Sequence, residues 1–103
     1  MEYRVTRPIK RPPTHPGEIW REDILPALGL SVDEAARRMR VEPSELAAVL
    51  DGAAPVTADM ALRFARLTGG TPELFLRMQL ARDLWEAEAR LRRTLKGIEP
   101  AVR

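Results

Sequence analysis

Apolar residues along this chain recur three and four positions apart, and β-branched residues never alternate with polar ones over five or more positions. The first pattern is typical of amphipathic helices, and half-buried strands would require the second. With 103 residues, 45% of them hydrophobic, the chain has enough material for one core. We therefore expect a single all-α domain of five helices, with a long C-terminal helix and an extended basic N-terminal arm.

Capping residues and prolines indicate where these helices begin and end. Proline suits a first helical position because no amide donor is needed there, and Ser or Thr caps the following helix. The sequence predicts helix starts at His15-Pro16, Ser31, Pro43, Thr57 and Thr71-Pro72. Pro26 should end or kink the first helix near Leu25, leaving residues 27–30 as a connection. The last helix should run from about 72 to 96.

The same spacing predicts which faces are buried. In the fourth helix Ala58, Ala61, Leu62 and Ala65 share one face. The last helix carries two apolar tracks, which are Leu74, Met78, Ala81, Trp85 and Leu80, Leu84, Ala87, Leu91, Leu95. We expect one track to pack on the parent domain and the other to meet a second subunit. The residues chosen for this homodimer interface are Met78, Ala81, Leu84 and Trp85.

Charge is distributed unevenly, although the whole chain carries only +2. Residues 1–14 form a proline-rich arm with Arg4, Arg7, Lys10 and Arg11 against Glu2. Residues 15–52 hold eight acids against four arginines, a net of −4. The helical domain is expected over 15–96, with 97–103 as a tail. The arm would either follow a DNA groove or remain a solvated terminus.

Several function classes lack the residues they need. The chain has no cysteine and a single histidine, His15, so disulfides, thiol catalysis and thiolate or histidine-cluster metal sites are excluded. No nucleophile and base pair is visible, and we expect neither an enzyme nor a cofactor. No apolar run approaches the roughly 20 residues that span a bilayer, and the N-terminus lacks a signal-peptide pattern. The sequence therefore predicts a soluble, cytoplasmic protein without a membrane partner.

Two short helical patterns, 31–40 and 43–51, are separated by a tight turn. Inside an all-α domain this spacing is typical of the helix-turn-helix unit, whose second helix enters the DNA major groove. Short helices joined by tight turns also build α domains of other functions, so the spacing alone leaves both readings open.

A string of motifs surrounds this unit in a specific order and spacing. These motifs are His15-Pro16-Gly17-Glu18-Ile19, Leu28-Gly29-Leu30-Ser31, Leu50-Asp51-Gly52, Val56-Thr57-Ala58-Asp59-Met60-Ala61-Leu62-Arg63 and Leu84-Trp85. Together they resemble the HigA-like (VapI-like) antitoxins, whose domain is of the Cro/C1 (Xre) type, over about residues 14–86. The resemblance implies a five-helix DNA-binding domain, usually homodimeric, that binds an operator at its own promoter. It also implies a toxin partner, an RNA-cleaving protein encoded beside it.

The chain departs from the Cro/C1 pattern in the helix that would read bases. Val32 stands where these domains commonly have glutamine, and the loop after the third helix is Ala53-Ala54 without a cation. Glu42, Glu45 and Asp51 bring carboxylates that phosphates repel. These acids argue against tight binding unless cations elsewhere supply it.

The DNA-contacting residues are predicted from the motif's geometry. They are Ser31, Arg40, Pro43, Ser44, Glu45 and Ala48, with backbone contacts from Arg4, Arg7, Lys10, Arg11, Arg37 and Arg38. Ser44 and Glu45 would lie nearest base edges, with Ser31 against a phosphate. The leading hypothesis is an autoregulating repressor and antitoxin of a HigBA-type system. The alternative is an antitoxin-derived protein-interaction module that has lost operator binding.

Overall fold

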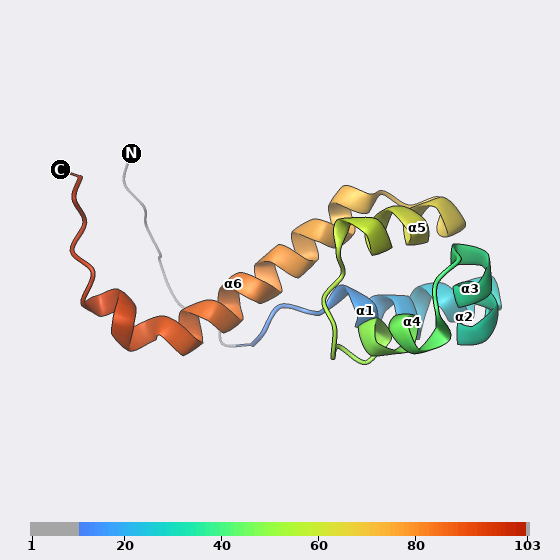
Figure 1. Ribbon diagram of the computed structural model, residues 1–103, viewed down its shortest axis with the longest axis horizontal. Helices are drawn as coiled ribbons and strands as arrows, with labels where there is room; N and C mark the ends of the chain where they lie inside the picture. Colours follow the sequence, from blue (N-terminus) through green and yellow to red (C-terminus); the bar gives the residue numbers. More distant parts are fainter. Residues whose placement is uncertain (1–10, 103) are drawn as a thin grey trace.

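The computed structural model describes residues 11–102, so Arg4, Arg7 and Lys10 lie outside the described residues. Within this range seven helical segments build five helices, without a strand. They are α1 (Pro16–Ile19), the π-helical turn η1 (Trp20–Ile24) and α2 (Leu25–Leu28), which run end to end as one helix, then α3 (Val32–Met39), α4 (Pro43–Leu50), α5 (Ala58–Thr68) and α6 (Pro72–Lys96). The predicted all-α, five-helix fold is confirmed. Figure 1 shows α1 to α5 gathered at one end and α6 extending away from them. The longest dimension of the molecule is 52 Å.

Pro26 does not end the first helix, which continues to Leu28, so the predicted connection over 27–30 is wrong. A proline inside a helix has no backbone N–H to donate in a hydrogen bond, and its ring crowds the preceding turn. Here the turn before Pro26 widens to π geometry, and the Leu25 N–H donates to the Trp20 carbonyl. The helix then ends at Gly29, whose φ of 68° is the left-handed conformation that glycine tolerates.

Local capping signals predicted most of the other boundaries. The Ser31 hydroxyl accepts the Glu34 N–H at 3.1 Å, and the Thr57 hydroxyl accepts the Met60 N–H at 3.2 Å. Pro16, Pro43 and Pro72 each open a helix. Thr71 occupies the N-cap position of α6 as predicted, but its side chain makes no capping hydrogen bond.

Three aromatic rings at the centre of the core join three helices. Trp20 stacks on Phe64 with ring centroids 3.7 Å apart, and Phe75 meets both rings edge-on. Phe64 comes from α5, whose predicted face was partly wrong: Ala61 and Ala65 are buried, whereas Ala58 and Leu62 are exposed. Because α5 is rich in alanine, its small apolar residues fall on two overlapping stripes. The large aromatic side chain selects the stripe that is buried.

The packing face of α6 belongs to neither predicted track. Its buried residues are Phe75 and Gln79, whereas Leu74, Leu80 and Leu84 are about half exposed. Gln79 is buried because its carbonyl oxygen accepts the Val56 N–H at 2.8 Å and its amide donates to Asp83 at 2.9 Å. This polar side chain therefore fixes the loop that precedes α5, a role that hydrophobic periodicity does not detect.

Replacing Gln79 with leucine should lower the free energy of unfolding by about 1–3 kcal/mol, because the buried Val56 N–H then has no acceptor. Urea denaturation followed by circular dichroism measures the loss. The control is Asp83→Asn, which keeps a partner for the Gln79 amide and leaves the bond to Val56 intact. Equal losses for the two variants would show that the Val56 bond is not what Gln79 contributes.

Candidate nucleic-acid interface

The helix-turn-helix predicted over 31–51 is formed by α3 and α4. Arg40, Val41 and Glu42 make the turn between them, and Arg40 has a φ of 61°. The Val41 N–H donates to the Ala36 carbonyl at 3.0 Å, which closes the end of α3. Glycine usually occupies such a left-handed position, so Arg40 holds a backbone conformation that costs an L-residue about 1 kcal/mol or more.

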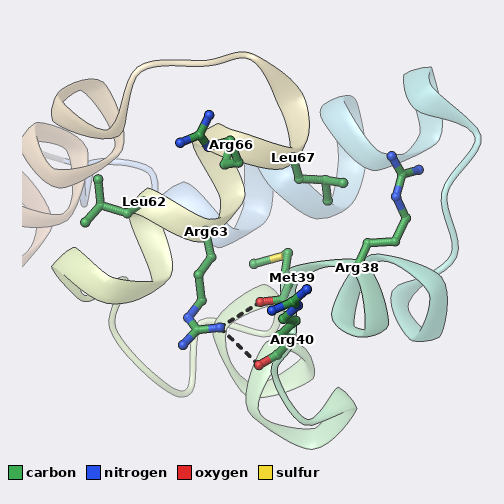
Figure 2. Close-up of a pocket in the computed structure, with 7 residues that line it drawn as sticks. All are labelled: Arg38, Met39, Arg40, Leu62, Arg63, Arg66 and Leu67. Atoms are coloured by element: carbon green, nitrogen blue, oxygen red, sulfur yellow. Dashed lines mark hydrogen bonds between the residues drawn. The ribbon is translucent and has the colours of Figure 1, made fainter.

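A guanidinium from α5 holds this turn in place. Arg63 donates to the carbonyls of Met39 at 2.8 Å and Arg40 at 3.0 Å (Figure 2). The Asp59 carboxylate accepts from the Arg63 Nε. The two carbonyls lie at the negative end of α3, where a cation is favourable. Arg63 therefore fixes α5 to the turn that sets the angle between α3 and α4.

The first helix holds the other end of α4 through close backbone contact. A Cβ on Gly17 would lie 1.9 Å from the Val49 carbonyl oxygen, so only glycine permits this approach. The His15 ring accepts the Gly17 N–H at Nδ1 and donates from Nε2 to the Ala54 carbonyl, which requires the neutral Nε2–H tautomer. Arg21 donates to the Leu50 carbonyl at 3.3 Å. His15 is thus a structural residue that ties α1 to the loop after α4.

The first turn of α4 presents the residues expected at base edges. Pro43, Ser44 and Glu45 are exposed, while Ala48 is half-buried. The Ser44 hydroxyl has no hydrogen-bond partner among residues 11–102. The Glu45 carboxylate accepts the Glu42 N–H at 3.4 Å, so Glu45 also serves the start of its own helix. The hydroxyl of Ser44 is therefore open to a ligand.

The cations predicted on α3 differ in their surroundings. Arg37 lies 3.8 Å from Glu34 in an exposed ion pair, and Arg38 and Arg40 are exposed. Ser31 caps α3 and is exposed at its N-terminus. Arg11 is exposed in the segment that precedes α1, where Arg82 of α6 donates to the Pro13 carbonyl at 3.0 Å. This bond ties the described end of the arm to α6.

A groove of about 460 Å³ lies between the end of α3 and α5 (Figure 2). It is lined by Met39, Leu62, Leu67, Arg38, Arg40, Arg63 and Arg66. Arg63 is engaged with the turn, whereas Arg38, Arg40 and Arg66 have no side-chain partner within the described range. The net charge counted over residues 15–52 did not include Arg63 and Arg66, which lie later in the sequence and which α5 brings beside α3. Their position opposite the buried Ala61 is the sequence signal that would have found them.

The four residues predicted for a dimer interface do not share one environment. Met78 and Trp85 are half-buried on the sides of α6, whereas Ala81 and Leu84 are exposed.

Between residues 11 and 102 no three His, Cys, Asp or Glu side chains gather as a metal site would require. None of the helices there, including the 25-residue α6, has the length and apolar character to cross a membrane.

No protein-family model matches the sequence, but individual proteins do. Virulence-associated protein I of Dichelobacter nodosus is 43% identical over 77 residues, covering 75% of this chain and 71% of that protein. Antitoxin HigA-1 of Vibrio cholerae is 31% identical over 94 residues, covering 91% of this chain and 89% of the relative. The chain belongs to the HigA-like family of helix-turn-helix antitoxins.

The fold of this HigA-like protein agrees with that assignment. The solved structure of antitoxin GraA in complex with its operator is 32% identical and superposes with a TM-score of 0.84, covering 97% of this chain and 100% of that one. The family resemblance predicted from the motif string is therefore confirmed.

Proposed function

We propose that this HigA-like protein is a sequence-specific DNA-binding repressor of its own operon and the antitoxin of a toxin–antitoxin pair. The observation that carries the proposal is the exposed first turn of α4, where Ser44 offers an unpaired hydroxyl next to a turn fixed by Arg63. The structural relative GraA, which is similar over 97% of this chain, is described in complex with its operator. The protein acts in the cytoplasm as a binding protein and not as an enzyme.

In this proposal α4 lies in the major groove with Ser44 and Glu45 nearest the bases. Pro43 and Ala48 flank them on the same helix. The exposed N-terminus of α3 at Ser31 contacts a phosphate, because backbone amides and the helix dipole favour an anion there. Arg37, Arg38 and Arg40 approach the DNA backbone, and Arg11 with the rest of the arm adds further cations. These contacts offset the acids of α4, since phosphate neutralisation supplies much of the affinity for DNA.

Substituting Ser44 with alanine should weaken binding to DNA from upstream of the gene by about 1 kcal/mol and leave binding to a scrambled duplex unchanged. Ser44 is exposed, so the fold is unaffected. Fluorescence anisotropy titrations on both duplexes measure the difference. The control is Ser31→Ala, which removes the cap of α3 and should weaken binding to both duplexes by the same amount. Equal losses on the two duplexes for Ser44→Ala would remove Ser44 from base recognition.

Arg40→Gly should raise the stability of the fold and lower the affinity for DNA. Glycine adopts a φ of 61° without the steric cost that arginine meets, so the free energy of unfolding should rise by about 1 kcal/mol. The lost guanidinium should weaken binding to every DNA sequence alike and reduce the slope of log affinity against log salt by about 1. Chemical denaturation and a salt series measure the two effects. With Arg77→Ala of α6 as control, an unchanged salt slope for Arg40→Gly would exclude a phosphate contact.

The antitoxin part of the proposal is supported by the named relative, HigA-1. It requires a toxin encoded by a neighbouring gene, which we expect to be a small RNA-cleaving protein. Co-expression of the two reading frames tests it. A stable complex that abolishes RNA cleavage is the expected result, and full cleavage activity in the presence of excess antitoxin would overturn it.

The protein is also proposed to act as a homodimer, because two copies double every contact to DNA. A second copy needs an apolar surface, and α6 provides one: Leu80, Leu84, Leu91 and Leu95 are all more than a third exposed, as is Ile98 just after the helix. Sedimentation at micromolar concentration should give the mass of two chains.

A further inference from the structure

The groove between the end of α3 and α5 combines apolar side chains with arginines. Met39 is buried and Leu67 is half-buried, whereas Leu62 is 60% exposed on α5. The other lining residues are all arginines, and none is an acid. Its volume of about 460 Å³ lies within the range of ligand sites, which place a few polar groups around an apolar lining. The groove therefore has the size and the chemistry of a binding site.

The acids of α3 and α5 do not neutralise the groove. Glu34 lies 3.8 Å from Arg37, and Asp59 accepts from Arg63. Asp33 lies in the first turn of α3, at the opposite end of the helix from the groove. Three exposed guanidiniums of the groove consequently have no side-chain partner among residues 11–102, and they are Arg38, Arg40 and Arg66. Their charge is available to a ligand with several anionic groups.

The three free guanidiniums are spread around the groove. Figure 2 shows Arg66 on α5, apart from Arg38 and Arg40 at the end of α3. A single small anion does not reach all three. An extended polypeptide carries a side chain about every 3.3 Å, so a short segment presents several carboxylates along the groove. The exposed Leu62 favours a polypeptide over a nucleic acid, because a phosphate backbone has no apolar side chain to cover it.

We propose that this groove binds an acidic segment of another protein, in which large apolar side chains are flanked by carboxylates. The apolar side chains cover Leu62 and Leu67, and the carboxylates pair with the three free guanidiniums of the groove. A basic segment is excluded because its charges would face these guanidiniums. Since α4 does not line the groove, the proposal goes beyond the proposed repressor and does not require it.

The groove shares two cations with the proposed DNA contact. Arg38 and Arg40 approach the DNA backbone in that proposal, so carboxylates bound to them withdraw them from the phosphates. Phosphate neutralisation supplies much of the affinity for DNA. An acidic segment in the groove should therefore weaken DNA binding, and this consequence alone rests on the proposed function.

A fluorescein-labelled peptide with two leucines flanked by glutamates tests the site on the full-length protein in the absence of DNA. Fluorescence anisotropy should show saturable binding. A second peptide with glutamines in place of the glutamates should bind about tenfold more weakly, because it cannot form ion pairs. Equal binding of the two peptides would overturn the proposal, as would no binding of either at about millimolar concentration.

Two substitutions locate the peptide in the groove. Leu62→Ala should weaken its binding about fivefold and Arg66→Ala about threefold. Both residues are exposed, so the fold is unaffected. The matched controls are Leu28→Ala, at a leucine 49% exposed near the end of the first helix, and Arg77→Ala on α6. Equal losses in the controls would show that the peptide binds elsewhere and would overturn the proposal.

The Leu62→Ala variant also distinguishes the other occupants of the groove. Sedimentation should give the same mass as the natural protein, and a shift to a lighter species would show that a second copy covers the groove and overturn the proposal. DNA titrations with this variant separate the two claims. Peptide binding by the natural protein without operator preference would contradict only the repressor. Operator preference without peptide binding would contradict only the acidic partner.

Discussion

Gly17→Ala is expected to lower the free energy of unfolding by about 3 kcal/mol or more. Alanine normally stabilises a helix relative to glycine by about 1 kcal/mol, so helix propensity alone predicts the opposite sign. Here the added Cβ would lie 1.9 Å from the Val49 carbonyl oxygen and 2.8 Å from the Val49 carbonyl carbon. Both atoms belong to the backbone of α4, which cannot yield without moving the helix.

The matched control is Gly97→Ala at the end of α6. That position is exposed, has a φ of −85°, and a Cβ there would meet Thr94 only at 3.5 Å. Urea denaturation should show the control within about 0.5 kcal/mol of the natural protein. Because the clash displaces α4, Gly17→Ala should also lose DNA binding at temperatures where it remains folded. A loss below about 1 kcal/mol would mean that α1 and α4 are not in the backbone contact described here.

Trp20→Ala is the second substitution with a large expected effect. It should lower the free energy of unfolding by about 4 kcal/mol. Trp20 is fully buried, stacks on Phe64 of α5 and meets Phe75 of α6 at 5.3 Å, so its removal opens a cavity among three helices. The control is Trp85→Ala, since Trp85 is half-buried on α6 and should cost much less. Thermal and urea denaturation of both variants measure the difference. If Trp20→Ala lowered the free energy of unfolding no more than Trp85→Ala does, Trp20 would not be at the centre of the core.

Trp20→Phe probes a second property of the same residue. The indole Nε1 of Trp20 is buried, and it has no hydrogen-bond partner among the described residues. An unsatisfied buried donor is destabilising, so phenylalanine removes that penalty while it loses part of the packing. We expect Trp20→Phe to lower the free energy of unfolding by about 1–2 kcal/mol, well below the loss for Trp20→Ala. Such a difference would show that the ring, and not the indole N–H, holds the three helices together.

Features with a local cause were predictable from the sequence. Ser31, Pro43 and Gly52 act on their own turn of chain, and the structure places them as a cap, a first helical residue and a left-handed glycine with a φ of 76°. The motif spacing likewise located α3 and α4. These signals need no knowledge of what packs against them.

Features decided by distant contacts were not predictable in the same way. The π turn before Pro26 exists because Trp20 and Leu25 are both held in the core, which favours continuing the helix over ending it. Gln79 is buried for a hydrogen bond to Val56, 23 residues away in sequence. Tertiary contacts of this kind override the local preference of a residue.

The candidate interface shows the same division. Ser44 and Arg40 follow from the helix-turn-helix spacing, whereas the groove with Arg63 and Arg66 follows from how α5 packs beside α3. Charge counted along contiguous segments assigned an acidic character to the region around the motif. The fold changes that balance because it brings in cations from the next helix.

The most direct test of the central claim is binding of the natural protein to DNA from upstream of its own gene, beside a scrambled duplex, by fluorescence anisotropy. The titrations should span about 50 to 200 mM salt, a range that separates phosphate-driven from base-driven binding. A repressor predicts a preference for its own DNA that persists at the higher salt. No binding, or equal binding to both duplexes that disappears with salt, would contradict the account and favour a protein-interaction module.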